Sequence, residues 1–161
     1  MLDQLKELIK MQKTLDENIL KGHGITKYPL ANRKIALITE LGELMNEFPT
    51  RFKDWKKTAK DNREKGLVEY VDCLHFALSL EAHFNNLAIN IDEIEDYSNC
   101  NYEDIDFSLC EIGAFLLEDD TLCILESLFN IGNNLGFTWE EIYKAYKEKN
   151  QVNYERLKNG Y

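Results

Sequence analysis

The sequence has 161 residues, of which 30% are charged, and a formal net charge of −10 at pH 7. This length predicts one domain, residues 1–161, with a substantial core. The acidic balance argues against nonspecific nucleic-acid binding, because phosphate backbones select basic surfaces.

The expected cellular setting follows from the cysteines and the apolar runs. The four cysteines form no C-x-x-C pair, so neither a zinc site nor a redox dithiol is indicated. No apolar run approaches the length of a membrane span, and the first residues lack the apolar core of a signal peptide. We therefore expect a cytoplasmic protein without a membrane partner.

Apolar residues recur with helical spacing along most of the chain, which contains only two prolines. The pattern predicts helices over residues 2–20, 30–48, 62–86, 107–118, 121–132 and 139–157. Residues 50–62 are lysine-rich around Trp55 and predict a connection or a short helix. Residues 87–106 are weakly periodic and predict a loop with one short helix. The expected fold is an all-α bundle of about five to seven helices.

Several helix starts carry capping signals. Thr138 and Glu141 form a capping-box pattern at the start of the last helix. Asp120 is placed to cap the helix before it, and Asp61 or Asn62 to cap the helix that follows the lysine-rich connection.

Two acidic pairs occupy the second and third predicted helices: Glu40-Leu41-Gly42-Glu43 and Glu69-Tyr70-Val71-Asp72. The i, i+3 spacing puts both acids of a pair on one helix face. If the two helices pack antiparallel, four half-buried carboxylates face each other and require a cation. The pattern thus predicts a carboxylate-lined metal site between two central helices, suited to Mg²⁺ or Mn²⁺.

Other interpretations of these acids stay open. Most helical glutamates are solvated surface charges. A carboxylate di-iron site is a competing metal site, but it needs E-x-x-H on two helices, and only Asp72-x-x-His75 comes close.

The ordered set of E-x-x-E, a lysine-rich connection and E-x-x-D resembles the all-α nucleoside triphosphate pyrophosphohydrolases. Within them, the run from Glu69 to Leu80 is similar to the dimeric dUTPases, as is the end of the chain, Gly136 to Tyr161. The resemblance implies Mg²⁺-dependent hydrolysis of dUTP, and also of dUDP, to dUMP by a homodimer. It implies attack of a metal-activated water on the α-phosphorus, release of pyrophosphate, and Glu43 as the general base.

The same resemblance implies residues that bind the nucleotide. His75, Phe76 and Trp55 would surround the uracil, and Gln12 would read its polar edge, since an amide both donates and accepts. The tail would hold the phosphates and the sugar through Lys149, Asn153, Arg156 and Tyr161. Relatives often have histidine where this chain has Tyr154 and glutamine where it has Leu157.

Two rival functions stay open at this point. An all-α pyrophosphatase for dCTP or a modified nucleoside triphosphate would differ in the base pocket. A non-catalytic helical binding module would not respond to EDTA in a hydrolysis assay.

Overall fold

The computed structural model describes residues 1–84, 91–101 and 104–160. Within these residues the protein has six α-helices, three short 3₁₀ helices and no strand. In chain order they are α1 (Leu2–Gly22), α2 (Leu30–Glu47), η1 (Pro49–Arg51), α3 (Arg63–Phe84), η3 (Ile91–Glu93), η4 (Tyr97–Asn99), α4 (Ile105–Glu118), α5 (Thr121–Asn134) and α6 (Trp139–Lys158). The all-α prediction is confirmed.

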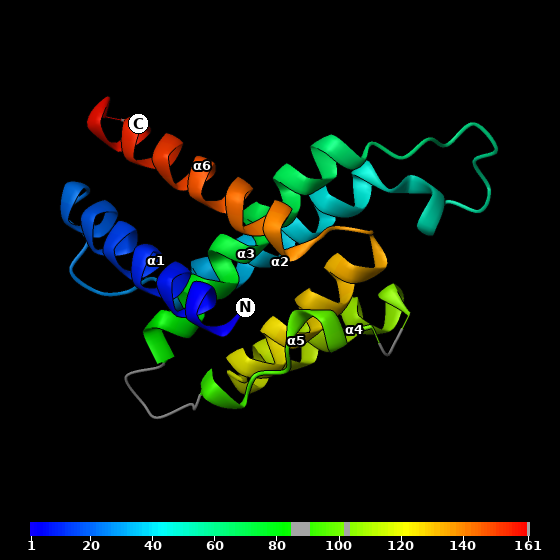
Figure 1. The fold of residues 1–161 in the computed structure, drawn as a ribbon. Coiled ribbons are helices and arrows are strands. Elements are labelled where there is room, and N and C mark those ends of the chain that lie inside the picture. Colours follow the sequence, from blue (N-terminus) through cyan, green and yellow to red (C-terminus); the bar gives the residue numbers. More distant parts are fainter. Residues whose placement is uncertain (85–90, 102–103, 161) are drawn as a thin grey trace.

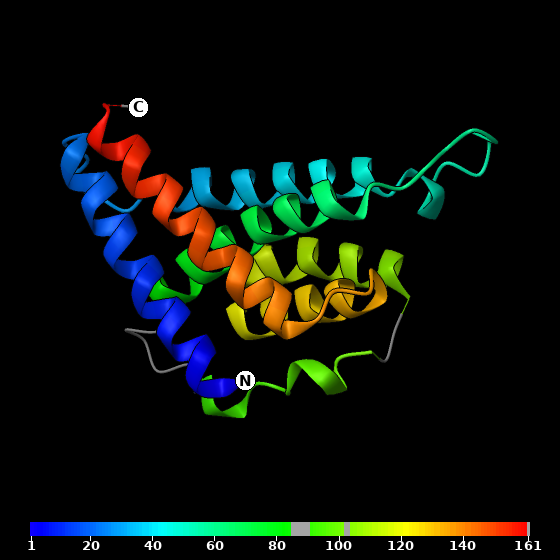
Figure 2. The same ribbon diagram turned by 45° about the horizontal axis from the view of Figure 1, so that its top comes forward.

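The helices form two antiparallel pairs that are crossed by a third pair. Figure 2 shows α2 lying along α3, with α4 and α5 beside them. Helices α1 and α6 run side by side in the same direction across α3 (Figure 1). The central helix α3 therefore contacts α1, α2, α5 and α6, which lets it present residues to a site built from several helices.

The predicted helix starts are set by the expected caps. The Thr138 hydroxyl accepts from the Glu141 backbone N–H at 3.2 Å, and the Glu141 carboxylate accepts from the Thr138 N–H, which completes the capping box. The Asp120 carboxylate caps α5 by accepting from the Cys123 N–H. Before α3, Asn62 rather than Asp61 accepts from the backbone of the first turn, and Asp61 binds Thr50 instead.

Two contacts fix the start of α3, the helix that carries the second acidic pair. The ring of Phe48 lies against Gly66, where a Cβ atom would meet the ring at 2.2 Å, so only glycine lets α3 approach the end of α2 this closely. Arg63 donates to both carboxylate oxygens of Glu141, at 3.0 and 2.8 Å, and thereby ties the start of α3 to the start of α6. Such a two-fold contact orients its partners better than a single point charge does.

Candidate active site

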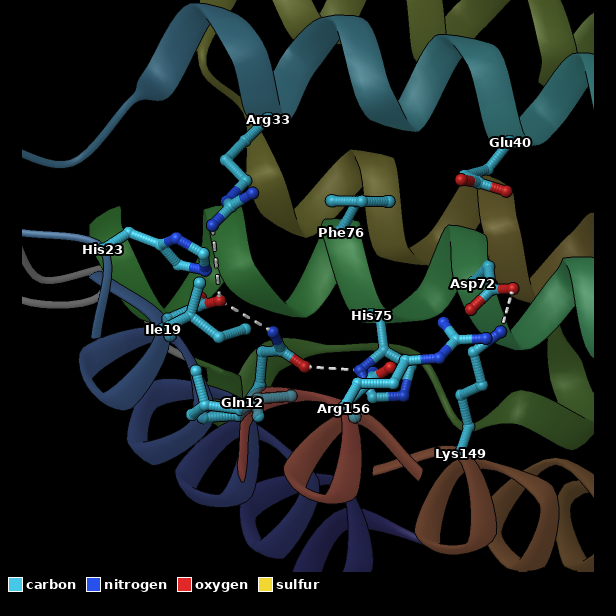
Figure 3. Close-up of a pocket in the computed structure, with 14 residues that line it drawn as sticks. Gln12, Ile19, His23, Arg33, Glu40, Asp72, His75, Phe76, Lys149 and Arg156 are labelled. Atoms are coloured by element: carbon cyan, nitrogen blue, oxygen red, sulfur yellow. Dashed lines mark hydrogen bonds and ion pairs between the residues drawn. The ribbon is translucent and has the colours of Figure 1, made fainter. Parts of the chain in front are cut away.

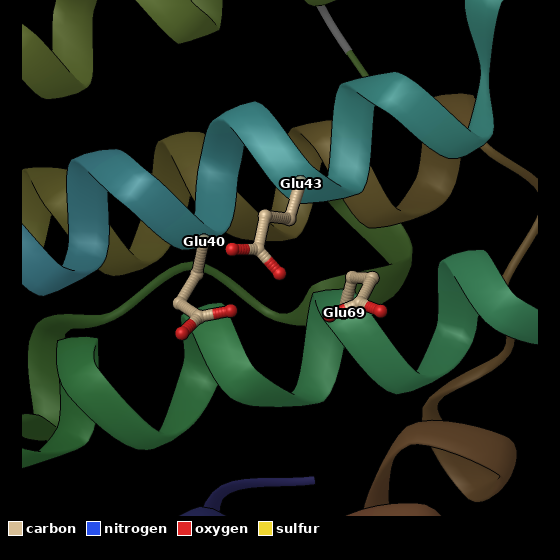
Figure 4. Close-up of side chains that lie close together, drawn as sticks. All are labelled: Glu40, Glu43 and Glu69. Carbon is tan, nitrogen blue, oxygen red and sulfur yellow. The ribbon is translucent and has the colours of Figure 1, made fainter.

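Three of the four acids in the paired motifs converge between α2 and α3. Glu40 and Glu43 lie one turn apart on α2, and Glu69 reaches toward them from α3 (Figure 4). One carboxylate oxygen from each residue lies within 4.8 Å of the others. The fold therefore contains the carboxylate cluster that the motifs predict between two central helices.

Burial and like charges disfavour ionisation of Glu40 and Glu69. The pKa of Glu40 is raised from about 4.5 to about 7, first by burial and then by the charges of Asp72, Glu43 and Glu69, against which Lys149 acts. The pKa of Glu69 is raised by burial and by Asp72 and Glu43. Burying several acids close together costs free energy, and a bound cation would offset that cost.

This electrostatic cost predicts a pH-dependent effect of Glu40→Gln on stability in the presence of EDTA. Below the unfolded-state pKa of Glu40, near 4.5, the carboxyl is protonated in both states and the substitution should gain little. As pH rises through the folded-state value of about 7, the wild type must ionise a group that the fold disfavours, and its stability falls relative to the variant. The gain in melting temperature should therefore grow between pH 4.5 and pH 7 and then level off.

The quantity to measure is the difference in melting temperature between Glu40→Gln and the wild type at each pH, because other groups titrate in both proteins. His75, whose pKa is lowered, changes stability in the opposite direction with pH and cancels in the difference. Glu47→Gln, one turn beyond Glu43 on α2, is the matched control and should show a much smaller growth, because Glu47 is the weakest of the charges that raise the pKa of Glu69. A gain from Glu40→Gln that is constant with pH would contradict the charge repulsion described here.

Asp72, the fourth predicted metal ligand, has a different partner in this structure. Its Oδ2 accepts from Lys149 Nζ of α6 at 2.5 Å, and both side chains are largely buried. Asp72 lies outside the group of converging oxygens formed by Glu40, Glu43 and Glu69. A predicted metal ligand and a predicted phosphate-binding residue thus form an ion pair beside the cluster.

A cavity of about 340 Å³ extends from Glu40 and Asp72 toward α1 (Figure 3). Its walls come from four helices, and most of the predicted nucleotide-binding residues line it: Gln12, His75, Phe76, Lys149, Asn153 and Arg156. The cationic side chains of Lys149 and Arg156 lie at the end near the acids, and Gln12 lies toward the opposite end (Figure 3). The cavity therefore joins an end where Glu40 and Asp72 lie near two cations to an end lined by Gln12 and its hydrogen-bond partner Asp16.

One predicted binding residue, Trp55, is not brought to this cavity. Trp55 lies in the connection between η1 and α3, where its side chain is 73% exposed, and it does not line the cavity. The role predicted for Tyr161 falls on a residue that lies outside the described part of the chain.

His75 is held as a neutral, oriented ring at the cavity wall. It is buried on α3, and its ring stacks on that of Tyr146 with centroids 4.0 Å apart and planes at 14°. Burial, with a smaller effect of the Lys149 charge, lowers the pKa of His75 to about 3, while the Tyr146 backbone acts weakly in the other direction. At neutral pH this imidazole is therefore uncharged.

The cavity also contains polar residues outside the predicted set. Asp16 of α1 and Arg33 of α2 line it and face each other, with Arg33 Nη2 3.9 Å from Asp16 Oδ1. Asp16 had a recognisable signal, because it lies four residues after Gln12 on the face of α1 that carries Leu8 and Leu15 toward the core. Arg33 had none, since an arginine in the first turns of a helix is usually exposed.

Comparison with known proteins agrees with this geometry. Among the described residues, no helix combines the length and apolarity needed to cross a membrane. No curated protein matches the chain. The dUTPase_2 family, described as dUTPase, matches residues 4–161, which is nearly the whole chain. The chain therefore belongs to this dUTPase family, as the motif resemblance implied, and it is an enzyme that hydrolyses dUTP to dUMP.

Proposed function

We propose that this dUTPase requires Mg²⁺, or Mn²⁺ in its place, held by Glu40, Glu43 and Glu69, with Asp72 completing the ligand set. The observation that carries the proposal is the convergence of the Glu40, Glu43 and Glu69 carboxylates, of which Glu40 also lines the cavity. The donor set fits the ion, because hard divalent cations prefer oxygen ligands and offset the repulsion among these acids.

The reaction then proceeds by attack of water on the α-phosphorus. When bound, the cation neutralises charge on the triphosphate oxygens and lowers the pKa of a water molecule. Glu43 accepts the proton of the attacking water, a bond forms from the water oxygen to the α-phosphorus, and the bond from that phosphorus to the bridging oxygen breaks. The products are dUMP and pyrophosphate; with dUDP the leaving group is inorganic phosphate.

The rest of the cavity would orient the nucleotide along its length. Lys149 and Arg156 contact the phosphate oxygens, and Asn153 on the same helix contacts the sugar or the base. Phe76 offers a flat apolar face to the uracil, beside His75 and Gln12. Trp55 and Tyr161 remain predicted contacts to the base and the deoxyribose.

The test is an assay of pyrophosphate release from dUTP, dTTP and dCTP with Mg²⁺ and with excess EDTA. We expect dUTP to be hydrolysed well above the other two, and EDTA to abolish turnover. Preferred hydrolysis of dCTP would support the rival pyrophosphatase. Full activity in EDTA would remove the cation from the mechanism while leaving the family activity intact.

We further propose that the enzyme is a homodimer that buries apolar residues of α2 and α4. Leu117 of α4 is 86% exposed and Ile35 of α2 is 63% exposed. Ile38 and Phe107 are also exposed on the same two helices, which Lys34 joins by donating to the Leu116 carbonyl. Apolar side chains in this number on adjacent helices support a covered surface.

Leu117→Glu is expected to weaken the dimer by about 10- to 100-fold. Burying a leucine side chain contributes about 1.5–3 kcal/mol, and the variant loses this contribution in the dimer. Light scattering coupled to size exclusion over a dilution series measures the dissociation. Val152→Glu, at another exposed apolar position on α6, is the control and should leave the dimer unchanged. A monomeric wild type at all concentrations would contradict the proposal.

A further inference from the structure

The side-chain amide of Gln12 has one orientation that satisfies its neighbours. Its Oε1 lies 2.6 Å from His75 Nδ1 and 2.7 Å from the Tyr146 hydroxyl, and its Nε2 donates to Asp16 Oδ1 at 3.0 Å. Because an ionised carboxylate only accepts hydrogen bonds, the amide nitrogen must face Asp16. The amide oxygen therefore faces His75 and Tyr146.

Asp16 is itself fixed from its other side. Its Oδ2 accepts from the Ser79 hydroxyl at 2.5 Å, and the Ser79 oxygen lies 2.7 Å from the Tyr28 hydroxyl. The guanidinium of Arg33, 3.9 Å away, offsets part of the cost of burying this carboxylate. Asp16 thus determines which groups donate and which accept along the hydrogen bonds that run through Gln12 to His75 and Tyr146.

The orientation of Gln12 determines which nitrogen of His75 carries the proton. Gln12 Oε1 has no hydrogen to give, so His75 Nδ1 must donate to it. In a neutral ring the other nitrogen, Nε2, is then a bare acceptor. Nε2 is buried, and it has no hydrogen-bond partner within the part of the chain that the structure describes.

We propose that Asp16, acting through Gln12, fixes His75 in the Nδ1–H tautomer so that Nε2 accepts the N3–H of uracil. Asp16 and Gln12 are then positioning residues for base selection, and His75 is the residue that reads the base. The inference rests on the proposed function, because it takes the base end of this cavity as the uracil site.

This arrangement distinguishes bases by the hydrogen at N3. Uracil and thymine both donate from N3, whereas N3 of cytosine is an acceptor. Cytosine would place two lone pairs against each other in a buried site, which is far costlier than a poor apolar fit. The tautomer therefore excludes dCTP, and it has no influence on the choice between dUTP and dTTP.

The first test measures kcat/KM for dUTP, dCTP and dTTP on the wild type and Asp16→Asn. Asparagine keeps the shape, but its amide can turn either its oxygen or its nitrogen toward Gln12, so the polarity is no longer fixed. We expect the ratio of dUTP to dCTP to fall by roughly 10- to 100-fold. The ratio of dUTP to dTTP should stay at its wild-type value.

Ser79→Ala is the matched control. It removes the other hydrogen bond to Asp16 but leaves the Asp16–Gln12 pair, so it should lower stability without changing the base ratios. Gln12→Met is a second variant in case Asp16→Asn does not fold. It removes the acceptor for His75 Nδ1–H at nearly constant volume and should lower the same ratio.

The second test reads the tautomer directly by long-range ¹H–¹⁵N NMR of protein labelled at its three histidines. His23→Gln and His83→Gln identify the signals. We expect an unprotonated Nε2 on His75 in the wild type and a mixture of tautomers in Asp16→Asn. A protonated Nε2 in the wild type, or an unchanged tautomer and unchanged dCTP ratio in Asp16→Asn, would overturn the inference alone. Equal hydrolysis of dUTP and dCTP by the wild type would overturn it together with the proposed uracil site.

Discussion

Replacing Glu43 by glutamine is expected to lower kcat by about 10²- to 10⁴-fold, the usual cost of losing a general base. The amide keeps the length and shape of the side chain but cannot accept a proton from the attacking water. Because the phosphates and the base are held by other residues of the cavity, KM for dUTP should change little.

The comparison that isolates this role uses three variants on two turns of α2. Glu40→Gln removes a carboxylate from the same cluster, and Glu47→Gln makes the same chemical change one turn beyond Glu43. Glu47→Gln should behave as the wild type in steady-state kinetics. If Glu40→Gln and Glu43→Gln instead raise KM alike with unchanged kcat, Glu43 serves only as a ligand and the proton goes elsewhere.

The fold could be predicted from the sequence because its signals are local. Apolar spacing and caps lie within a few residues of the elements they define, and the Thr138 capping box forms as its pattern predicts. The predicted helix from residue 107 in fact begins at Ile105, after Asp104, because weak periodicity gives a poor estimate of where a helix starts. The expected end of α3 near Asn86 falls outside the described residues.

The cluster of acids was predictable for the same reason, but the partners of its members were not. The spacing of Glu40, Glu43 and Glu69 identifies helix faces, and two facing helices then bring them together. The pairing of Asp72 with Lys149 depends on how α6 crosses α3, and the two residues are 77 positions apart. No local pattern encodes that crossing.

The base end of the cavity shows the same limit. The sequence predicts Gln12 at the base, and in the structure its amide oxygen contacts His75 and Tyr146. Those contacts join α1 to α3 and α6, so they follow from tertiary packing alone. Trp55, chosen for its flat ring, lies in an exposed connection whose position the sequence pattern does not determine.

Asp72→Asn should weaken Mg²⁺ binding, and kcat/KM should fall with it. Loss of a residue that only supports a metal ligand costs roughly 10- to 100-fold in affinity, and loss of a ligand should cost more. The variant should still fold, because fewer like charges then share the site with Glu40 and Glu69. The ion pair with Lys149 offers another explanation for the same loss of activity, since Asp72 would then only anchor the lysine.

Lys149→Met separates the two explanations because it acts in opposite directions on the cation and on the nucleotide. Removing the ammonium frees Asp72 and takes a positive charge away from the acids, so Mg²⁺ should bind about tenfold tighter to the nucleotide-free protein, equivalent to 1.4 kcal/mol. KM for dUTP should rise, because a contact to the phosphates is lost. If Asp72 were only an anchor for the lysine, the two variants should have the same kinetics, and Asp72→Asn should not weaken Mg²⁺ binding as the loss of a ligand does.

Titration calorimetry with Mg²⁺ alone, followed by kinetics on dUTP, measures both quantities for the wild type, each single variant and the double variant. With Asp72 as a ligand, the double variant should bind Mg²⁺ weakly, as Asp72→Asn does. Once the Asp72 carboxylate is absent, removing Lys149 no longer frees a ligand, so the affinity for Mg²⁺ gains little. With Asp72 as an anchor, the double variant should match either single variant in kcat/KM, and Asp72→Asn should bind Mg²⁺ nearly as tightly as the wild type. Unchanged Mg²⁺ affinity in Asp72→Asn would therefore remove Asp72 from the ligand set and leave Glu40, Glu43 and Glu69 as its protein ligands.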